Sequence, residues 1–308
     1  MNRKRTCRKS LPRAGNREGR VEKRALLPYK RPWQGRKSET HEGMTMKNAP
    51  GERPILLIGT SETCPDIEYA SGFQAVDAVV FLEHGKKKHL VVPQMELGRA
   101  QRAARGVDVL SPEQLALSGG GRWRLAEAAA ALLRRERIRT VVVPRDFPYG
   151  TAVKLQKKGI RLRIAEEELF PQRAVKRPDE SRTIREAQQA AVIAMRSAVE
   201  MISESEEGGD GCLLLRGRRL EAEDVRRMIS RVLLEHDCIS RDIIVAGGMQ
   251  AVDPHEKGTG FLRAHEAIVI DIFPRHQGHG YWGDLTRTVI KGTVPASLRT
   301  MYHAVRAA

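Results

Sequence analysis

Cysteine is scarce in this sequence, and so are long apolar runs. The four cysteines, Cys7, Cys64, Cys212 and Cys238, show neither C-x-x-C spacing nor a disulfide framework, which is typical of a reducing compartment. No apolar run approaches the roughly 18 residues that a membrane span needs. The N-terminus is basic but has no apolar segment of the kind found in secretory signals. These absences predict a cytoplasmic protein with no membrane partner.

The positive charge is concentrated at the N-terminus. Of a formal net charge of +16, residues 1–43 hold 14 Lys/Arg and 4 Asp/Glu, or +10, which leaves 40 against 34, or +6, for the rest. Residues 1–46 lack apolar periodicity and are predicted to be a basic disordered extension. Two readings stay open: a tail that binds nucleic acid or an acidic surface, or sequence upstream of a true start at Met44 or Met46. The mildly basic remainder makes a nucleic-acid partner the weakest alternative.

Residues 47–172 alternate between strand-like and helix-like segments. A short apolar run at 54–59 predicts a strand, and two apolar runs around Gly85 predict a hairpin over 78–92. Leucine and alanine at helical spacing predict a helix over 122–138. A strand, a short helix and a further strand are then expected between 140 and 165. The alternation predicts a small α/β domain.

Residues 173–308 have a different order of elements. Pro178 and Asp179 suit the start of a helix, and a second amphipathic helix is predicted over 220–236. Strand-like runs then follow at 242–248, 267–273 and 281–289. The apolar face of the first helix is formed by Ile184, Ala187, Ala191, Ala194, Ala198 and Ile202. Two helices followed by antiparallel strands predict an α+β domain.

Two aspartates lie symmetrically about a glycine in the last two strands. If Gln277-Gly278 is a two-residue turn, the numbers of paired residues add up to 555, and Asp271 faces Asp284 on the same side of the hairpin. Two carboxylates about 5 Å apart repel by about 3 kcal/mol at an effective dielectric near 20. A shared proton, a basic partner such as Arg287 or a metal ion would offset this repulsion. The alternative is a pair of solvent-facing aspartates that form salt bridges.

The surrounding motifs resemble those of the pita-bread metallopeptidases, the family of prolidase, X-prolyl aminopeptidase and methionine aminopeptidase. The resemblance rests on a loop histidine in Asp253-Pro254-His255, on Asp271 and Tyr281, and on the run Gly-Asp-Leu-Thr-Arg-Thr at 283–288, which is most similar to the proline-specific branch. Residues 59–73 resemble the start of the N-terminal domain of the creatinase and prolidase branch, and residues 173–191 resemble the first helix of the catalytic domain. The resemblance covers residues 54–308.

This resemblance implies a fold, an activity and a site. The fold is an α/β N-terminal domain of the creatinase/prolidase type over 47–172, followed by an incomplete α+β pita-bread domain over 173–308. The activity is hydrolysis of X-Pro peptide bonds by an aminopeptidase or dipeptidase that acts on peptides with proline at the second position and forms a homodimer. Two divalent ions are implied, manganese first, with cobalt, zinc or iron as alternatives. Asp271 and Asp284 are expected to be metal ligands, and His255 is expected to be a catalytic residue that contacts the substrate.

The chain departs from the family pattern in two ways. The two aspartates lie two residues farther apart than the family has them; an even insertion keeps both on one face. The family also needs a later histidine and two later glutamates, whereas no Asp or Glu follows Asp284 and the last histidine is His303. The catalytic domain is therefore expected to be truncated, and the chain as given to be inactive. His276 and His279 belong to the added hairpin length and are predicted to point away from the site.

Two other kinds of function remain as alternatives. A pita-bread binding module without peptidase activity would fit the missing ligands, although it has no need for two facing carboxylates. Creatinase-like hydrolysis without a metal is disfavoured, because that branch does not use the aspartate pair as ligands.

Overall fold

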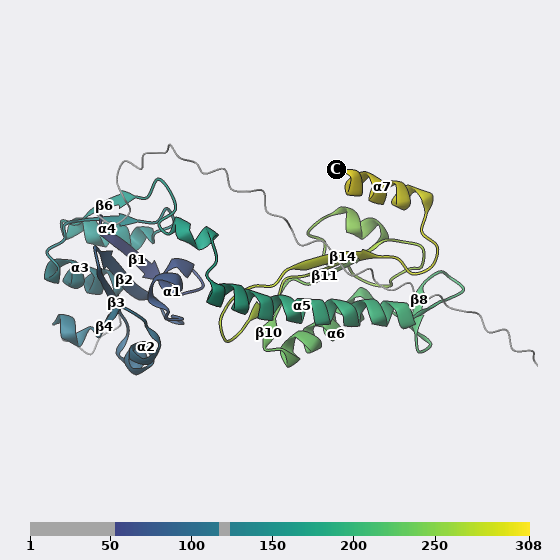
Figure 1. The fold of residues 1–308 in the computed structure, drawn as a ribbon, viewed down its shortest axis with the longest axis horizontal. Coiled ribbons are helices and arrows are strands. Elements are labelled where there is room, and N and C mark those ends of the chain that lie inside the picture. Colours follow the sequence, from purple (N-terminus) through teal and green to yellow (C-terminus); the bar gives the residue numbers. More distant parts are fainter. Residues whose placement is uncertain (1–52, 117–123) are drawn as a thin grey trace, which may run out of the picture. The chain divides into compact units, whose positions relative to one another are not determined.

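The computed structural model describes residues 53–116 and 124–308 (Figure 1). The predicted basic extension, residues 1–46, lies outside the described residues. Within the described ranges, none of the helices combines the length and the hydropathy of a membrane span.

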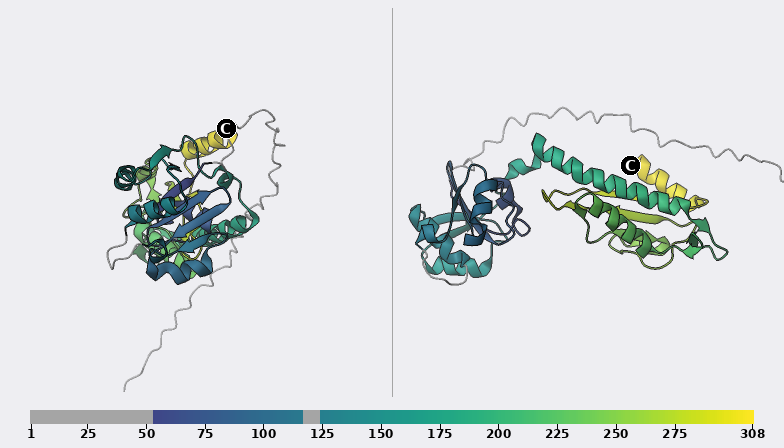
Figure 2. Two further views of the ribbon diagram at one scale, coloured as in Figure 1. Left: turned by 90° about the vertical axis from the view of Figure 1, so that its left-hand side faces the viewer. Right: turned by 90° about the horizontal axis from the view of Figure 1, so that it is seen from below.

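Residues 53–172 form a mixed six-stranded sheet with helices on both faces (Figure 2). The strand order is β4-β3-β2-β1-β5-β6; β1 and β2 pair antiparallel, as do β2 and β3, and the other neighbours are parallel. The strands are β1 (Ile55–Gly59), β2 (Val79–His84), β3 (Lys87–Val91), β4 (Asp108–Leu110), β5 (Thr140–Val143) and β6 (Arg161–Ile164). The helices are α1 (Pro65–Ser71), α2 (Leu97–Ala103), α3 (Leu125–Arg135) and α4 (Tyr149–Lys157), and the 3-10 turns are η1 (Gln94–Glu96), η2 (Glu113–Leu115) and η3 (Pro171–Ala174).

Alternating side chains of the buried strands supply both cores of this sheet. Leu56 and Ile58 of β1 pack with α3 and α4, whereas Leu57 packs on the opposite face with α1 and α2. The predicted hairpin is present as β2 and β3, with Gly85 in its turn at φ +61°. Strands buried on both faces explain why these segments read as continuous apolar runs rather than alternating ones.

From residue 178 onward, two helices pack against each other and against one face of a three-stranded antiparallel sheet of order β11-β12-β14 (Figure 1). The helices are α5 (Pro178–Glu204), α6 (Ala222–Glu235) and α7 (Ala296–Ala307), with the 3-10 turn η4 (Gly248–Val252). The strands are β7 (Glu206–Glu207), β8 (Leu213–Leu215), β9 (Arg218–Arg219), β10 (Cys238–Ile239), β11 (Ile244–Gly247), β12 (Ile268–Ile272), β13 (Arg275–His276) and β14 (Leu285–Val289).

The predicted helix start at Pro178 is confirmed. Pro178 occupies the first turn, where its missing N–H costs nothing, and the Glu180 carboxylate accepts the amide proton of Arg177 at 2.9 Å. The apolar face of α5 is buried against α6 and the sheet, as its alanine spacing predicts. Ile268, Ile270 and Ile272 of β12 point into the same core, so Asp271 leaves the sheet on the opposite face.

Candidate metal centre

The hairpin between β12 and β14 closes through a four-residue loop at 277–280. The amide of His276 donates to the carbonyl of Tyr281 at 3.0 Å, so these two residues flank the loop. The predicted two-residue turn at Gln277-Gly278 is therefore wrong. The cause is Gly280, which takes the left-handed conformation at φ +71° and donates its amide to the His276 carbonyl at 2.9 Å, closing a single helical turn.

The longer loop shifts the strand register by two residues. Asp271 lies opposite Thr286, so the numbers of paired residues add up to 557 and not to 555. The predicted direct pairing of Asp271 with Asp284 is therefore also wrong. Because the shift is even, both aspartates remain on the same face of the ladder. As diagonal neighbours in a regular ladder they lie about 7–8 Å apart, farther than a directly opposed pair.

Asp271 is half-buried and held by a neighbouring hydroxyl. The hydroxyl of Thr286, directly across the ladder, donates to Oδ1 of Asp271 at 2.5 Å. Arg287, which the sequence offered as a basic partner, instead donates to the carbonyl of Thr286 at 2.7 Å. Among the described residues, Asp271 forms no salt bridge, so its second carboxylate oxygen is free of a basic partner.

Asp284 is exposed, and its main chain is held by helix α5. The side-chain amide of Gln188 donates to the Asp284 carbonyl at 3.0 Å and accepts the Asp284 amide proton at 2.9 Å. The preceding Gly283 lies so close to the helix that a Cβ there would be 2.5 Å from the carbonyl oxygen of Ala187. Gln188 thus replaces a strand partner where the ladder ends. No local pattern in the sequence predicts this contact, because the two residues are 96 positions apart.

His255 lies in an exposed loop after η4. Its amide donates to the Asp253 carboxylate at 3.1 Å, which shapes the turn at Pro254. Gly258 anchors the end of this loop against β11, where the Val245 amide donates to the Lys257 carbonyl at 3.0 Å. In the described part of the chain, no hydrogen bond or ion pair joins the His255 ring to either aspartate. The ring is free to meet a substrate, and its catalytic role stays a prediction.

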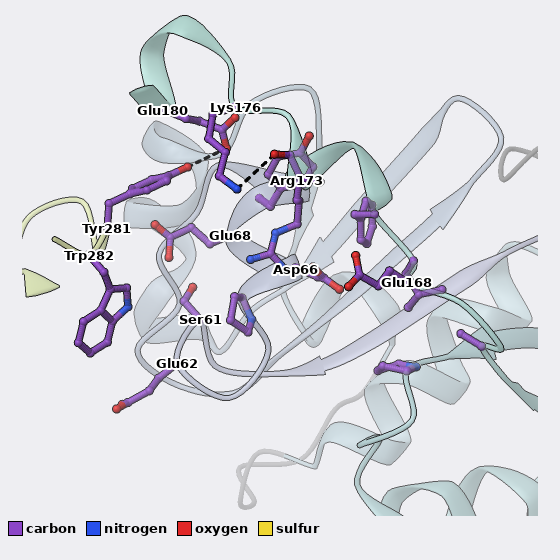
Figure 3. A pocket seen from close by; sticks show the side chains of 18 of the residues that line it. Ser61, Glu62, Asp66, Glu68, Glu168, Arg173, Lys176, Glu180, Tyr281 and Trp282 are labelled. Carbon is purple, nitrogen blue, oxygen red and sulfur yellow. Dashed lines mark hydrogen bonds and ion pairs between the residues drawn. The ribbon is translucent and has the colours of Figure 1, made fainter. Parts of the chain in front are cut away.

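Tyr281 ties the hairpin to the start of α5. Its hydroxyl donates to the Glu180 carboxylate at 2.8 Å, beside a cavity of about 1020 Å³ (Figure 3). Burial first, and then the hydrogen bond to Glu180, raises the pKa of Tyr281 well above its usual value of 10.0. Burial likewise raises the pKa of the Glu68 carboxyl, which lines the same cavity. Trp282 is 55% exposed and also lines this cavity.

Replacing Tyr281 with phenylalanine should lower the free energy of unfolding by about 1–3 kcal/mol at pH 7, because the buried Glu180 carboxylate loses its donor. The folded protein keeps the tyrosyl proton where the unfolded chain loses it. The contribution of Tyr281 is therefore present below pH 10 and is lost as the pH rises above that value. Urea unfolding between pH 7 and 11 should show the difference between wild type and Tyr281→Phe shrinking above pH 10. Tyr302→Phe on exposed α7 is the matched control, and a pH-independent difference would contradict the assignment.

His276 and His279 come together within the loop. They are three residues apart in the helical turn, and their rings stack with centroids 3.8 Å apart and planes 9° apart. Burial of the ring, and then the neighbouring His276, lowers the pKa of His279. Nε2 of His279 lies 3.5 Å from Oε2 of Glu186 on α5. Sequence reasoning treated the two histidines as residues across a turn and did not anticipate the stack.

The two aspartates fit part of a divalent-metal centre. Both carboxylates lie on one face of a rigid ladder, one is oriented by a hydroxyl, and neither has a salt bridge among the described residues. Hard oxygen ligands of this kind suit divalent cations. Cys64, by contrast, is buried, and burial raises the pKa of its thiol to about 11, as expected for a packed thiol.

A comparison with known protein families identifies the C-terminal part of the chain as similar to one of them. Residues 182–308 match the sequence profile described as Metallopeptidase family M24. No curated protein matches the chain.

Solved structures with a similar fold include several peptidases. They include the prolidase from Pyrococcus furiosus (17% identity, TM-score 0.63), the Xaa-Pro dipeptidase from Bacillus anthracis (19%, 0.66) and the X-Pro aminopeptidase from Thermotoga maritima (15%, 0.66). Each comparison covers 82% of this chain but only 64–66% of the other, so the chain spans less than two thirds of their length. At these identities the likeness establishes a mixed α/β fold that matches the pita-bread domain.

Proposed function

We propose that the chain carries part of a metal-dependent aminopeptidase or dipeptidase that cleaves X-Pro bonds, on the basis that residues 182–308 match the model of metallopeptidase family M24. Asp271 and Asp284 hold divalent ions, manganese first, with cobalt, zinc or iron as alternatives. His255 contacts the substrate. The names of three structurally similar proteins, a prolidase, an Xaa-Pro dipeptidase and an X-Pro aminopeptidase, support the choice of substrate.

The observation that carries this proposal is the shared face of the two aspartates. Asp271 lies opposite Thr286 and Asp284 precedes it by two residues, so both carboxylates leave the ladder on the side away from α5 and α6. A binding module has no need to keep two like charges as diagonal neighbours. A cation between them turns the repulsion into a binding contribution.

Each residue of the proposed site has a separate task. When bound, divalent ions in such a centre polarise the scissile carbonyl and lower the pKa of a water molecule. Thr286 fixes one oxygen of Asp271 through its hydroxyl, which leaves the other oxygen to the cation. Gln188 fixes the main chain of Asp284 and so limits where its carboxylate can reach. His255, on its exposed loop, is proposed to donate a proton or a hydrogen bond to the substrate.

Further features of the enzyme are proposed on the same basis. Residues 47–172 form a domain of the creatinase/prolidase type, the complete enzyme is a homodimer, and its substrates are peptides with proline at the second position. The free, buried Cys64, Cys212 and Cys238 support a reducing, cytoplasmic setting.

Metal binding tests the site directly in this chain. After treatment with a chelator, the protein is titrated with Mn²⁺, and free Mn²⁺ is followed by electron paramagnetic resonance. Asp271→Asn and Asp284→Asn should each weaken binding at least about 10-fold, because each removes a charged ligand. Glu235→Gln, an exposed carboxylate at the end of α6, is the matched control. Equal affinity in all four proteins would favour a binding module without a metal centre.

Peptide hydrolysis is the second readout. Since the chain spans only 64–66% of the similar structures, we expect no turnover of an X-Pro dipeptide by the chain alone with added Mn²⁺. Turnover that Asp284→Asn abolishes would refute the predicted inactivity while supporting the site.

A further inference from the structure

The hairpin loop and helix α5 bring together two imidazoles and a carboxylate that the proposed peptidase centre does not use. One ligand atom from each of Glu186, His276 and His279 lies within 4.8 Å of the others. The histidines come from the helical turn at 276–280, and Glu186 comes from the third turn of a 27-residue helix. Within the described residues this is the one group of three such side chains that converges in this way.

The two rings are oriented by the main chain. Nδ1 of His276 accepts the amide proton of Gly278 at 3.0 Å, and Nδ1 of His279 accepts the amide proton of Tyr281 at 3.2 Å. With Nδ1 turned to the backbone in both rings, Nε2 is left as the nitrogen available to an outside partner. The same residue spacing in both contacts explains why the rings lie parallel.

One of these nitrogens has no hydrogen-bond partner within the described part of the chain. Nε2 of His279 is buried and forms no hydrogen bond with any described residue. Oε2 of Glu186 lies 3.5 Å from this nitrogen, too far for a good hydrogen bond. Buried polar atoms are nearly always paired, so an unpaired one beside two other ligand groups calls for a missing partner.

We propose that Nε2 of His276, Nε2 of His279 and the Glu186 carboxylate bind one divalent transition-metal ion, with zinc as the best match. Imidazole nitrogen and carboxylate oxygen are zinc ligands at about 2.0–2.2 Å, and three of them leave a fourth position open. Tetrahedral geometry at such lengths puts ligand atoms about 3.3 Å apart, so the present spread of up to 4.8 Å closes on binding.

Binding also changes the tautomer of both rings. In the metal-free loop Nδ1 accepts a hydrogen bond, so the ring proton of a neutral histidine is on Nε2. A metal at Nε2 requires that proton at Nδ1, with no change in net charge, and Nδ1 then no longer accepts the amide of Gly278 or Tyr281. The loop at 277–280 must therefore rearrange, and these two amides report on ligation.

The site would fasten the hairpin to α5. Two contacts already join them, Tyr281 to Glu180 and the Asp284 main chain to Gln188. Glu186 lies between Glu180 and Gln188 in the sequence of α5, so a metal ion held there would add a third attachment between the hairpin and the helix. It shares no ligand with the proposed Asp271 and Asp284 centre.

The test uses the full chain with Asp271→Asn and Asp284→Asn, which removes the proposed peptidase centre from the measurement. Isothermal titration of this background variant with Zn²⁺ should show one equivalent bound. A further substitution, His276→Ala or His279→Ala, should weaken that binding at least about 100-fold. Glu186→Gln in the same background should also weaken it. His303→Ala, an exposed histidine on α7, is the matched control and should change nothing. Circular dichroism establishes that each variant is folded.

Amide resonances decide whether the ligand atoms are those proposed. Zn²⁺ should shift the Gly278 and Tyr281 amides in the nitrogen-proton spectrum of the same background variant. No zinc binding in that background, or binding that survives both histidine substitutions, would overturn the proposal. Binding that leaves both amides unmoved would overturn ligation through Nε2. These results are independent of whether Mn²⁺ binding depends on the aspartates.

Discussion

Gly258→Ala is expected to lower the free energy of unfolding by about 3 kcal/mol or more, the largest loss expected from adding one methyl group to a glycine in the described part of the chain. A Cβ at this position would lie 1.9 Å from the carbonyl oxygen of Val245 and 2.7 Å from the Cα of Ala246. Both are main-chain atoms in the middle of strand β11, which is hydrogen-bonded to β12, so neither can swing aside as a side chain would. The φ of +77° adds a further penalty of about 1–2 kcal/mol for any residue with a Cβ.

Gly260→Ala separates these two causes. Gly260 lies in the same loop at nearly the same φ, +76°, but a Cβ there meets nothing within 4 Å. It should therefore show only the backbone penalty, about 1–2 kcal/mol. Urea unfolding gives the free energy of unfolding of both variants, and the difference between their losses is the cost of the steric clash with β11. Equal losses would mean that the loop moves away from the strand at no cost.

The position matters to the proposed site because Gly258 ends the loop that carries His255. The Val245 amide is held by the Lys257 carbonyl, and the Gln250 side chain bonds the amide and carbonyl of Thr259. A loop pushed off β11 loses these contacts. His255, whose own ring has no partner among the described residues, would then lose its position as well.

Sequence patterns predicted those elements whose side chains repeat with a clear period. The alanine face of α5 and the apolar runs of β1, β2 and β12 are present where periodicity expects them. The start of α5 was readable because Pro178 and Asp179 are local signals of a helix N-terminus. In each case the interaction that decides the structure involves near neighbours in the sequence, or burial of one whole face.

The hairpin shows where such reasoning stops. A glycine at 278 and another at 280 both permit a turn, and which one takes positive φ depends on the closure of the whole loop. Choosing Gly278 gave the wrong register, although the even error kept both aspartates on one face. The long-range contacts that hold the hairpin against α5 could not be predicted from the sequence at all. Tyr281 and Glu180 are 101 residues apart, and Gln188 carries no mark of its partner.

The contact between α5 and the segment before β14 is the part of the site most sensitive to substitution. A Cβ on Gly283 would lie 2.5 Å from the Ala187 carbonyl oxygen and 2.9 Å from the Gln188 amide nitrogen, both in the main chain of α5. Gly283 is not among the described glycines that have a positive φ. Glycine is therefore needed at this position only because a side chain would not fit. The helix cannot yield locally, because its neighbouring Ala187 is fully buried in the core.

Gly283→Ala is therefore expected to lower the free energy of unfolding by about 2–3 kcal/mol and to weaken Mn²⁺ binding at least about 10-fold, through displacement of Asp284. Gln188→Ala removes the two hydrogen bonds to Asp284 without a clash, so it should cost about 1–2 kcal/mol and speed hydrogen exchange at the Asp284 amide. Gly209→Ala, where a Cβ meets nothing within 4 Å and φ is not positive, is the control. If Gly283→Ala destabilises the chain while Mn²⁺ affinity holds, the helix supports the fold only, because a displaced Asp284 cannot remain a ligand in an unchanged site.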